Sequence, residues 1–415
     1  MRSVRRARPT LDPIRSYHPR TAFDAARSGN DRRRRSNVYT GVMSGADPDS
    51  RRNFLFGRVS SALRRIETAG ASGADSGTDG AAGIEGADEA AARGNGGSDW
   101  LLEFTRDAMA CRWQVLLDPD GPTDRAEGAI DALALLDPLE DQLSVYRESS
   151  EISRLNRTAA TDWVSVEERL YELLETGRRL HRLTDGAFDM TAGPLSRVWG
   201  FHRREGRVPT AEELREALSR VGTDRVEFDA ARRAIRYLVP GIEINLGGIG
   251  KGHALDRVVE RLIGWGVRDV LVHGGQSSVA ARGRRRAGAE GWLVGLSHPV
   301  WPGRRLAEIR LQDEALGTSG TGRQHFYHQG KRYGHILDPR TGMPSDALLS
   351  ATVIAPTAAE ADAAATACHV LGEARSIRLI ESQPNWRGLL AVADGARDRV
   401  RLVPIRLDGR WERLE

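Results

Sequence analysis

Apolar positions recur along this chain with two different spacings. A helical spacing of about 3.6 residues, or a strongly helix-forming composition, marks four segments: 126–146, 166–183, 253–265 and 358–371. Short runs typical of strands mark six others: 113–117, 225–238 (a strand pair), 243–246, 270–273, 292–296 and 388–393. Because these elements follow one another without a regular strand–helix–strand repeat, the pattern predicts an α+β fold rather than a doubly wound sheet.

The composition excludes several classes of protein. No apolar run approaches the length of about 18 residues that a membrane-spanning helix needs, so we expect no transmembrane segment. The chain has 2 cysteines in 415 residues, too few for a disulfide framework or a cysteine-based zinc site.

The positive charge is concentrated at the N-terminal end. Residues 1–66 contain 16 arginines and 5 aspartates, a net charge of +11, which leaves 45 basic and 52 acidic residues, a net charge of −7, for the rest. An acidic body is a poor match for nucleic acid, so we expect no nucleic-acid partner. We expect residues 1–98 to be a disordered basic tail and Gly/Ala-rich linker, and residues 99–415 to be a single folded domain.

The tail also raises the question of export. A start at Met43 rather than Met1 would place Arg51 and Arg52 near the N-terminus, in the string 50–56, which resembles a twin-arginine signal. The following residues lack the 7–15-residue apolar core of a signal peptide. Cytoplasmic is therefore the default expectation, with export through this segment as the alternative.

A glycine-rich turn at 245–252 is the densest chemical signal. A strand enters it, a helix leaves it, and Lys251, one of only two lysines, lies inside it. Successive backbone N–H groups at such a turn suit a phosphate or diphosphate. Walker A and dinucleotide motifs do not match, because Gly252 and His253 occupy positions that those motifs reserve for other residues. The glycines alone fit a purely structural turn equally well.

Two further groups of polar residues could take part in catalysis. The segment 335–342 places His335, Asp338 and Arg340 before a turn, which suits acid/base or anion-orienting chemistry as well as it suits a surface ion pair. Asp362 and Thr366 are four apart in an alanine-rich helix, so their oxygens share one face and could bind Mg²⁺. Surface polar residues of a helix are the alternative for this pair.

Two more loops carry candidate contacts. Residues 184–195 form a structured loop with one aromatic residue expected to be buried and a carboxylate that could contact substrate, and residues 316–320 form a hydroxyl-rich turn. His325 and His328 lack a third ligand and are interpreted as solvated loop histidines rather than a metal site.

Taken in order, these segments resemble the ApbE family, the FAD:protein FMN transferases. The resemblance covers about 300 residues and rests on the following segments: 109–111, 144–146, 150–156, 185–189, 199–201, 245–252, 274–275, 318–320, 335–342 and 361–367. It implies an α+β catalytic domain of two packed subdomains with a cofactor cleft between them.

The resemblance also implies an activity. FAD would be cleaved at its diphosphate with Mg²⁺, FMN would be joined by a phosphodiester bond to a Thr or Ser of a target protein, and AMP would be released. FAD is then the substrate, Mg²⁺ the cofactor and an acceptor protein the partner. The residues that it places at the FAD site are Met109, Tyr146, Ala187, Phe188, Asp189, Asn245, Lys251 and Ile336. It places Asp362, Thr366 and the carbonyl of Gly248 at the metal, and His335 and Asp338 in the catalytic loop.

Some positions depart from the family pattern. Asn245 replaces the usual Asp, Gln276 stands where many members have an acid, and Ala365 stands where some members have another acidic metal ligand. Fewer carboxylates near the diphosphate would weaken Mg²⁺ binding or mark a subgroup with other acceptors. The missing carboxylates make a non-catalytic FAD-binding flavin carrier one alternative. A second alternative is an FAD pyrophosphatase that yields FMN and AMP without an acceptor.

Overall fold

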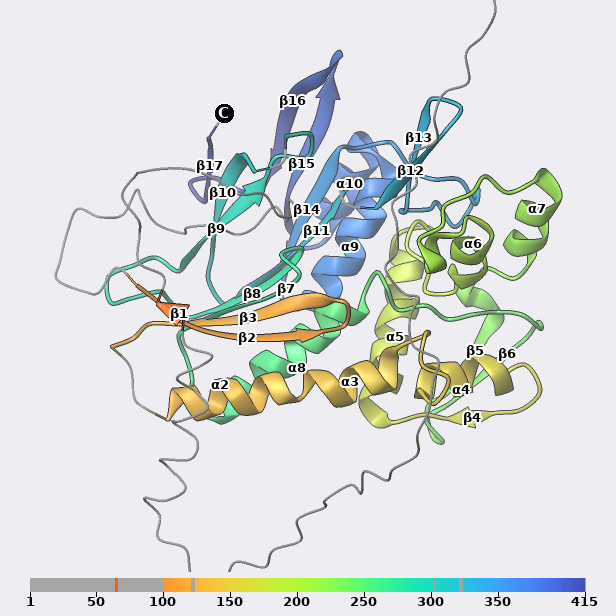
Figure 1. The fold of residues 1–415 in the computed structure, drawn as a ribbon, viewed down its shortest axis with the longest axis horizontal. Helices are drawn as coiled ribbons and strands as arrows, with labels where there is room; N and C mark the ends of the chain where they lie inside the picture. Colours follow the sequence, from red (N-terminus) through yellow and green to blue (C-terminus); the bar gives the residue numbers. More distant parts are fainter. Residues whose placement is uncertain (1–63, 66–99, 121–123, 302, 321–323, 415) are drawn as a thin grey trace, which may run out of the picture. The chain divides into compact units, whose positions relative to one another are not determined.

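A nine-stranded antiparallel sheet organises the molecule (Figure 1). The computed structural model describes residues 64–65, 100–120, 124–301, 303–320 and 324–414. The predicted tail and linker and the twin-arginine string therefore lie outside the described residues, apart from the two-residue strand β1 (Arg64–Arg65), which pairs with β2.

The large sheet has the order β1-β2-β3-β7-β8-β11-β14-β15-β16. Its longer strands are β2 (Leu102–Ala108), β3 (Cys111–Leu117), β7 (Val270–Gly274), β8 (Ser278–Arg282), β11 (Glu314–Gly320), β14 (Ser350–Ala355), β15 (Arg387–Asp394) and β16 (Ala396–Ile405). All neighbouring strands are antiparallel, which confirms the α+β expectation.

Helices cover one face of this sheet and a small sheet covers the other. On the helical face lie α2 (Arg125–Ala134), α8 (Gly250–Gly264), α9 (Ala358–Leu371) and α10 (Glu373–Ser382). On the other face lie β9 (Trp292–Ser297), β10 (Arg305–Leu311) and β17 (Trp411–Arg413). In β7, Val270 and Val272 pack toward the helices and Leu271 packs toward the small sheet, as the two-residue period of a strand buried on both faces requires.

Most of the remaining elements lie beside the large sheet, at the right of Figure 1, whereas the helix after α2 continues below the sheet in this view and contacts α8 and β2. These remaining elements are α3 (Leu136–Leu143), α4 (Glu151–Thr158), β4 (Val164–Ser165), α5 (Glu168–Leu183), α6 (Gly193–Val198), the 3₁₀ turns η1 (Phe201–Arg203) and η2 (Thr223–Arg225), α7 (Ala211–Ser219), β5 (Val226–Asp229), β6 (Ala234–Tyr237), and the hairpin of β12 (His325–His328) and β13 (Lys331–Gly334). One hydrophobic core joins this part to α9 and to β14.

Most of the predicted elements are present, and four predictions of local structure were wrong. The turn predicted over 316–320 is part of strand β11, and His325 and His328, expected in a loop, are exposed residues of strand β12. The helix predicted over 126–146 is broken at Leu135 into α2 and α3, because Pro138 has no N–H to donate to the preceding turn. The strand predicted over 243–246 makes only an isolated bridge at Glu243. The backbone N–H and carbonyl of Ile244 bond to the side chain of Asn156 instead of to a strand.

Candidate functional site

The glycine-rich turn brings the start of α8 close to α9. Asn245 Oδ1 accepts a hydrogen bond of 2.9 Å from the Gly247 N–H, and α8 begins at Gly250. A Cβ at Gly252 would lie 2.1 Å from the carbonyl oxygen of Ala358, the first residue of α9. The absence of a side chain at Gly252 therefore lets the two helices cross in close contact, with Lys251 at the crossing.

Asp362 is buried where α9 packs against the sheet. The Ser278 hydroxyl lies 2.8 Å and 2.9 Å from its two carboxylate oxygens. Burial raises the pKa of Asp362 to about 6, while the charge of Lys251 opposes this shift. The alternative that Asp362 is an ordinary surface residue of a helix is therefore wrong, since its side chain faces the interior beside a cation.

Thr366 lies one helical turn after Asp362 and points to the same region. Its hydroxyl donates to the Asp362 carbonyl oxygen at 3.0 Å and lies 3.1 Å from Ser319 Oγ. A Cβ at Gly248 would lie 3.5 Å from Thr366 Oγ1 and 3.2 Å from the Phe188 ring. Gly248, Phe188 and Thr366 are thus brought together from three separate segments.

These oxygens fit a small hard cation. The set combines the Asp362 carboxylate, the Thr366 hydroxyl and the backbone of Gly248, which lies near Thr366. Since Thr366 donates its proton to a carbonyl, its oxygen acts as an acceptor, and one lone pair remains beside the contact with Ser319. Oxygen donors of this kind are those that Mg²⁺ prefers. Ligation itself stays a prediction.

Lys251 connects the metal-binding candidates to the catalytic loop. Its ammonium donates to the hydroxyl of Ser277, the residue before Ser278 in the turn between β7 and β8. Its charge also lowers the pKa of His335. Lys251 is therefore near enough for its charge to act on both Asp362 and His335, which the sequence alone did not show.

His335 is held by a backbone carbonyl. Its Nδ1 lies 3.1 Å from the carbonyl oxygen of Gln324. Because a carbonyl can only accept, Nδ1 carries the proton and Nε2 carries the lone pair of the neutral ring. Burial lowers the pKa of His335, and the Gln324 carbonyl opposes this effect. The neutral ring is therefore favoured near pH 7, and its Nε2 can accept a proton.

Asp338 is already engaged within its own loop. Arg340 donates to its two carboxylate oxygens at 2.8 Å each, and the backbone N–H of Arg340 donates to Oδ1 at 3.0 Å. The ion pair expected as the alternative to catalysis is present. A Cβ at Gly186 would lie 3.6 Å from Arg340 Cγ, so the pair also contacts the 185–189 loop.

Asp189 is bonded within the protein, which changes its expected role. One of its oxygens accepts from the N–H and hydroxyl of Thr191 and from the hydroxyl of Thr223, and the other accepts from the N–H of Thr223. His181 Nδ1 lies 3.1 Å from this second oxygen. The carboxylate therefore holds the loop that carries Phe188, and its contact with FAD stays a prediction.

The pair of His181 and Asp189 is expected to make stability depend on pH. Burial alone would lower the pKa of His181, but Asp189, helped by Asp224, raises it above its ordinary value of 6.5. A group with a raised pKa stabilises the folded state below its unfolded pKa and loses that contribution as pH rises through the folded pKa. We expect the difference in free energy of unfolding between the wild type and His181→Gln, from urea denaturation, to be larger at pH 6 than at pH 8.5. Equal differences at the two pH values would contradict this role.

The other residues proposed for the FAD site occupy three different environments. Met109 lies in the tight turn between β2 and β3 with φ of 51°, and its N–H donates to Glu140 at 2.9 Å. Ala187 and Ile336 are buried, whereas Tyr146 is 69% exposed. Their contacts with FAD stay predictions.

The sequence reasoning missed Ser277 and Ser278. They follow Gly275 and Gln276, both of which have positive φ, in the turn between β7 and β8. The signal was a hydroxyl pair one residue after the glycine pair at 274–275. Ala365, one of the departures from the family pattern, is fully buried in the hydrophobic core, so this position contributes no polar atom.

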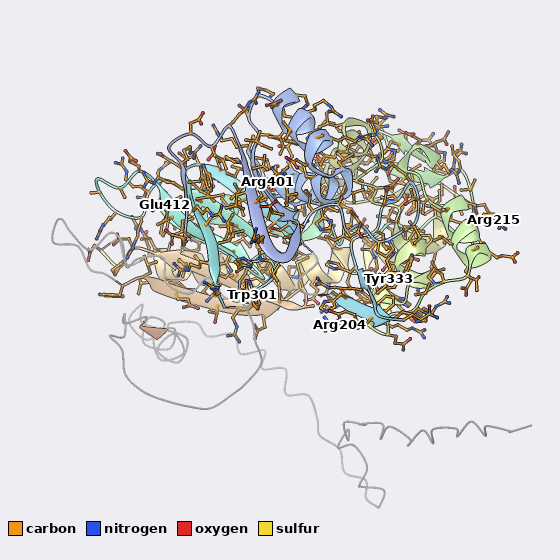
Figure 2. The ribbon with its side chains drawn as sticks, turned by 90° about the horizontal axis from the view of Figure 1, so that it is seen from above. Arg204, Arg215, Trp301, Tyr333, Arg401 and Glu412 are labelled. Carbon is orange, nitrogen blue, oxygen red and sulfur yellow. The ribbon has the colours of Figure 1, made fainter. Side chains whose placement is uncertain are left out.

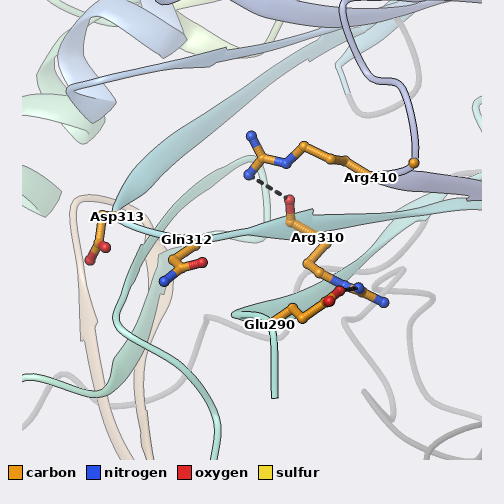
Figure 3. Close-up of a pocket in the computed structure, with 6 residues that line it drawn as sticks. Glu290, Arg310, Gln312, Asp313 and Arg410 are labelled. Atoms are coloured by element: carbon orange, nitrogen blue, oxygen red, sulfur yellow. Dashed lines mark hydrogen bonds and ion pairs between the residues drawn. The ribbon is translucent and has the colours of Figure 1, made fainter. Parts of the chain in front are cut away.

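A hollow elsewhere on the surface is a weaker candidate for the functional site. It lies by β10 and is lined by Glu290, Arg310, Gln312, Asp313, Gly409 and Arg410 (Figure 3). Arg310 pairs with Glu290, and Arg410 pairs with Glu314, so neither guanidinium lacks a carboxylate partner.

Along the part of the chain that the structure describes, no helix combines the length and the apolar character that crossing a bilayer requires. The prediction that the chain has no transmembrane segment agrees with this finding as far as the description reaches.

Comparison with known proteins agrees with this geometry. The profile of the ApbE family matches residues 109–390. The FAD:protein FMN transferase of Haemophilus influenzae is 32% identical over 256 residues, which is 60% of this chain and 73% of that protein. The protein of the same name from Treponema pallidum is 30% identical over 336 residues, 75% of this chain and 92% of its own.

Solved structures of ApbE proteins also resemble the structure of this chain. The apo form of the Pseudomonas stutzeri flavinyl transferase ApbE superposes with a TM-score of 0.65 at 29% identity and covers 74% of this chain and 95% of its own. The flavin transferase ApbE from Vibrio cholerae superposes with a TM-score of 0.64 at 28% identity, covering 74% and 97%.

Proposed function

Because this chain belongs to the ApbE family and is a flavin transferase, we propose that it cleaves FAD in a Mg²⁺-dependent reaction, joins FMN to a Thr or Ser hydroxyl of a target protein and releases AMP. One observation carries this proposal: the convergence of the glycine-rich turn, Lys251, Asp362 and Thr366 at the crossing of α8 and α9.

These residues would share the work of binding the diphosphate. Mg²⁺ held by Asp362, Thr366 and the Gly248 carbonyl would neutralise charge that develops on the phosphate oxygens. Lys251 supplies a fixed positive charge beside it, at the N-terminal end of α8 where helix-terminal N–H groups also favour an anion. Ser277 and Ser278 orient Lys251 and Asp362, respectively.

In this proposal His335 would activate the acceptor. Its Nε2 would take the proton of the acceptor hydroxyl as the oxygen attacks the phosphorus of the FMN half. A new O–P bond forms, the bond from that phosphorus to the bridging oxygen breaks, and AMP leaves with the bridging oxygen. Asp338 holds Arg340 in the same loop, which keeps a guanidinium beside the 185–189 loop.

The test uses purified protein, FAD and Mg²⁺ with a threonine-containing acceptor domain, with and without EDTA. We expect AMP release on chromatography and a gain in acceptor mass equal to one FMN residue, both abolished by EDTA. The released AMP and the flavinylated acceptor should be equal in amount, because each transfer yields one of each.

Two outcomes would replace this proposal with another. AMP together with free FMN and an unmodified acceptor would indicate a pyrophosphatase in which water takes the place of the hydroxyl. FAD that binds tightly and stays intact with Mg²⁺ and several acceptor domains would indicate a flavin carrier, the alternative suggested by Asn245, Gln276 and Ala365.

A further inference from the structure

A basic surface lies on the β12–β13 hairpin and on the loop next to it. We call it the hairpin surface and define it by three cationic residues, all exposed: Arg203, Arg204 and Lys331. Figure 2 shows Arg204 beside Tyr333 of the hairpin, at one edge of the molecule.

Aromatic packing holds the loop on the hairpin. The Phe201 ring lies 5.6 Å from Phe326, and the Trp199 ring lies 5.5 Å from Tyr333, between ring centroids. A Cβ at Gly206 would lie 2.6 Å from the Phe326 ring, so the backbone of the loop rests directly on the hairpin. The loop that carries Arg203 and Arg204 is therefore packed against the hairpin that carries Lys331.

The charge of this surface is largely uncompensated. Within the described ranges, no carboxylate lies within ion-pair distance of Arg203, Arg204 or Lys331, whereas many arginines elsewhere are paired. Lys331 lies over the Tyr333 ring at 5.3 Å. Glu205 is the exposed acid of the same loop. Against a body with a net charge of −7, a positive surface of this kind is a local exception.

The hairpin is tied at its base to the catalytic loop. Strand β13 ends at Gly334, directly before His335, and β12 begins directly after Gln324. Both the N–H and the Nδ1 of His335 lie 3.1 Å from the Gln324 carbonyl oxygen. At about 3.3 Å per residue, Lys331 lies about 13 Å along the strand from His335. A polypeptide whose hydroxyl reaches His335 can therefore reach Lys331 with a residue about four positions away, when it runs along the hairpin.

We propose that the hairpin surface docks an acidic segment of the acceptor protein; the assignment rests on the proposed transfer of FMN to a protein. Exposed complementary charge speeds encounter and sets partner choice without entering the chemical step. The surface therefore acts on the affinity for the acceptor, while FAD binding and the rate of the bound complex are set at the crossing of α8 and α9.

A binding experiment tests the surface independently of catalysis. The probes are two fluorescein-labelled 12-residue peptides with a central threonine, one carrying four glutamates and the other four glutamines. The variant reverses three charges (R203E, R204E and K331E), and a matched control reverses three exposed arginines elsewhere (R182E, R215E and R268E). Arg215 lies on α7, apart from the hairpin (Figure 2).

We expect the glutamate peptide to bind the wild type and the control equally, and the triple variant at least about tenfold more weakly, since each exposed charge pair contributes a fraction of a kcal/mol or more. The difference should shrink in 0.5 M salt. Equal binding of both peptides, or unchanged binding to the triple variant, would overturn the proposal. So would a 12-bp DNA duplex that displaces the peptide at equal concentration, because the surface would then be a general polyanion site.

Transfer to the same peptides separates this proposal from the proposed function. We expect the triple variant to raise the KM for the glutamate peptide at least about tenfold with kcat and FAD affinity kept. If the triple variant transferred FMN with the KM of the wild type, the proposed transferase activity would stand, and the hairpin surface would be excluded as the docking site. Binding of the peptide as expected, without AMP release from the wild type either here or in the assay with acceptor domains, would retain the surface and exclude the transferase.

Discussion

Replacing Asp362 by alanine or asparagine is expected to reduce AMP release at least about a thousandfold. Asp362 is the only carboxylate in the proposed ligand set, and a lost metal ligand removes several kcal/mol of stabilisation from the developing charge. The fold is expected to survive in Asp362→Asn, because the amide has the size of the carboxylate and can still accept from Ser278 through its oxygen. Product chromatography and thermal denaturation measure the two effects.

The matched control is Asp408→Asn. Asp408 is exposed in the turn between β16 and β17, remote in sequence from the site residues, so its loss should leave AMP release unchanged. An Asp362→Asn protein that folds and turns over at the wild-type rate would exclude Asp362 as a metal ligand. Rescue of part of the activity by Mn²⁺ would instead support a weakened metal site.

Replacing Gly252 by alanine is expected to destabilise the protein by about 3 kcal/mol or more, at the upper end of overpacking effects. The new Cβ would lie 2.1 Å from the Ala358 carbonyl oxygen and 2.4 Å from its carbon, and backbone atoms cannot rotate away. α8 and α9 must then separate, which moves Lys251 away from Asp362. Urea denaturation and FAD titration of the folded fraction should both show the loss.

Gly264→Ala provides the control for this substitution. Gly264 is the last residue of the same helix, and a Cβ there would have no neighbour within 4 Å. Its replacement is expected to leave stability unchanged or to raise it by up to about 1 kcal/mol, the difference in helix propensity between the two residues. If both substitutions had the same effect, the close contact at Gly252 would have no energetic importance.

Local patterns predicted much of the secondary structure. The helix at 358–371 has the predicted limits, since its run of small, helix-forming residues is bounded by the Thr357 cap and by Gly372 at positive φ. The strand predicted over 243–246 failed for a reason that lies elsewhere in the chain. Asn156, 88 residues away, satisfies the backbone of Ile244 and takes the place of a partner strand.

In the candidate site, too, some features follow from the sequence and others only from the tertiary structure. The sequence alone determined which residue types could act and that Asp362 and Thr366 share a helix face, because spacing along a helix sets that relation. Only the tertiary structure decided which candidates meet. It brought Lys251, Asp362 and His335 together, bonded Asp189 inside the fold and exposed Tyr146, because each outcome depends on contacts between segments far apart in the chain.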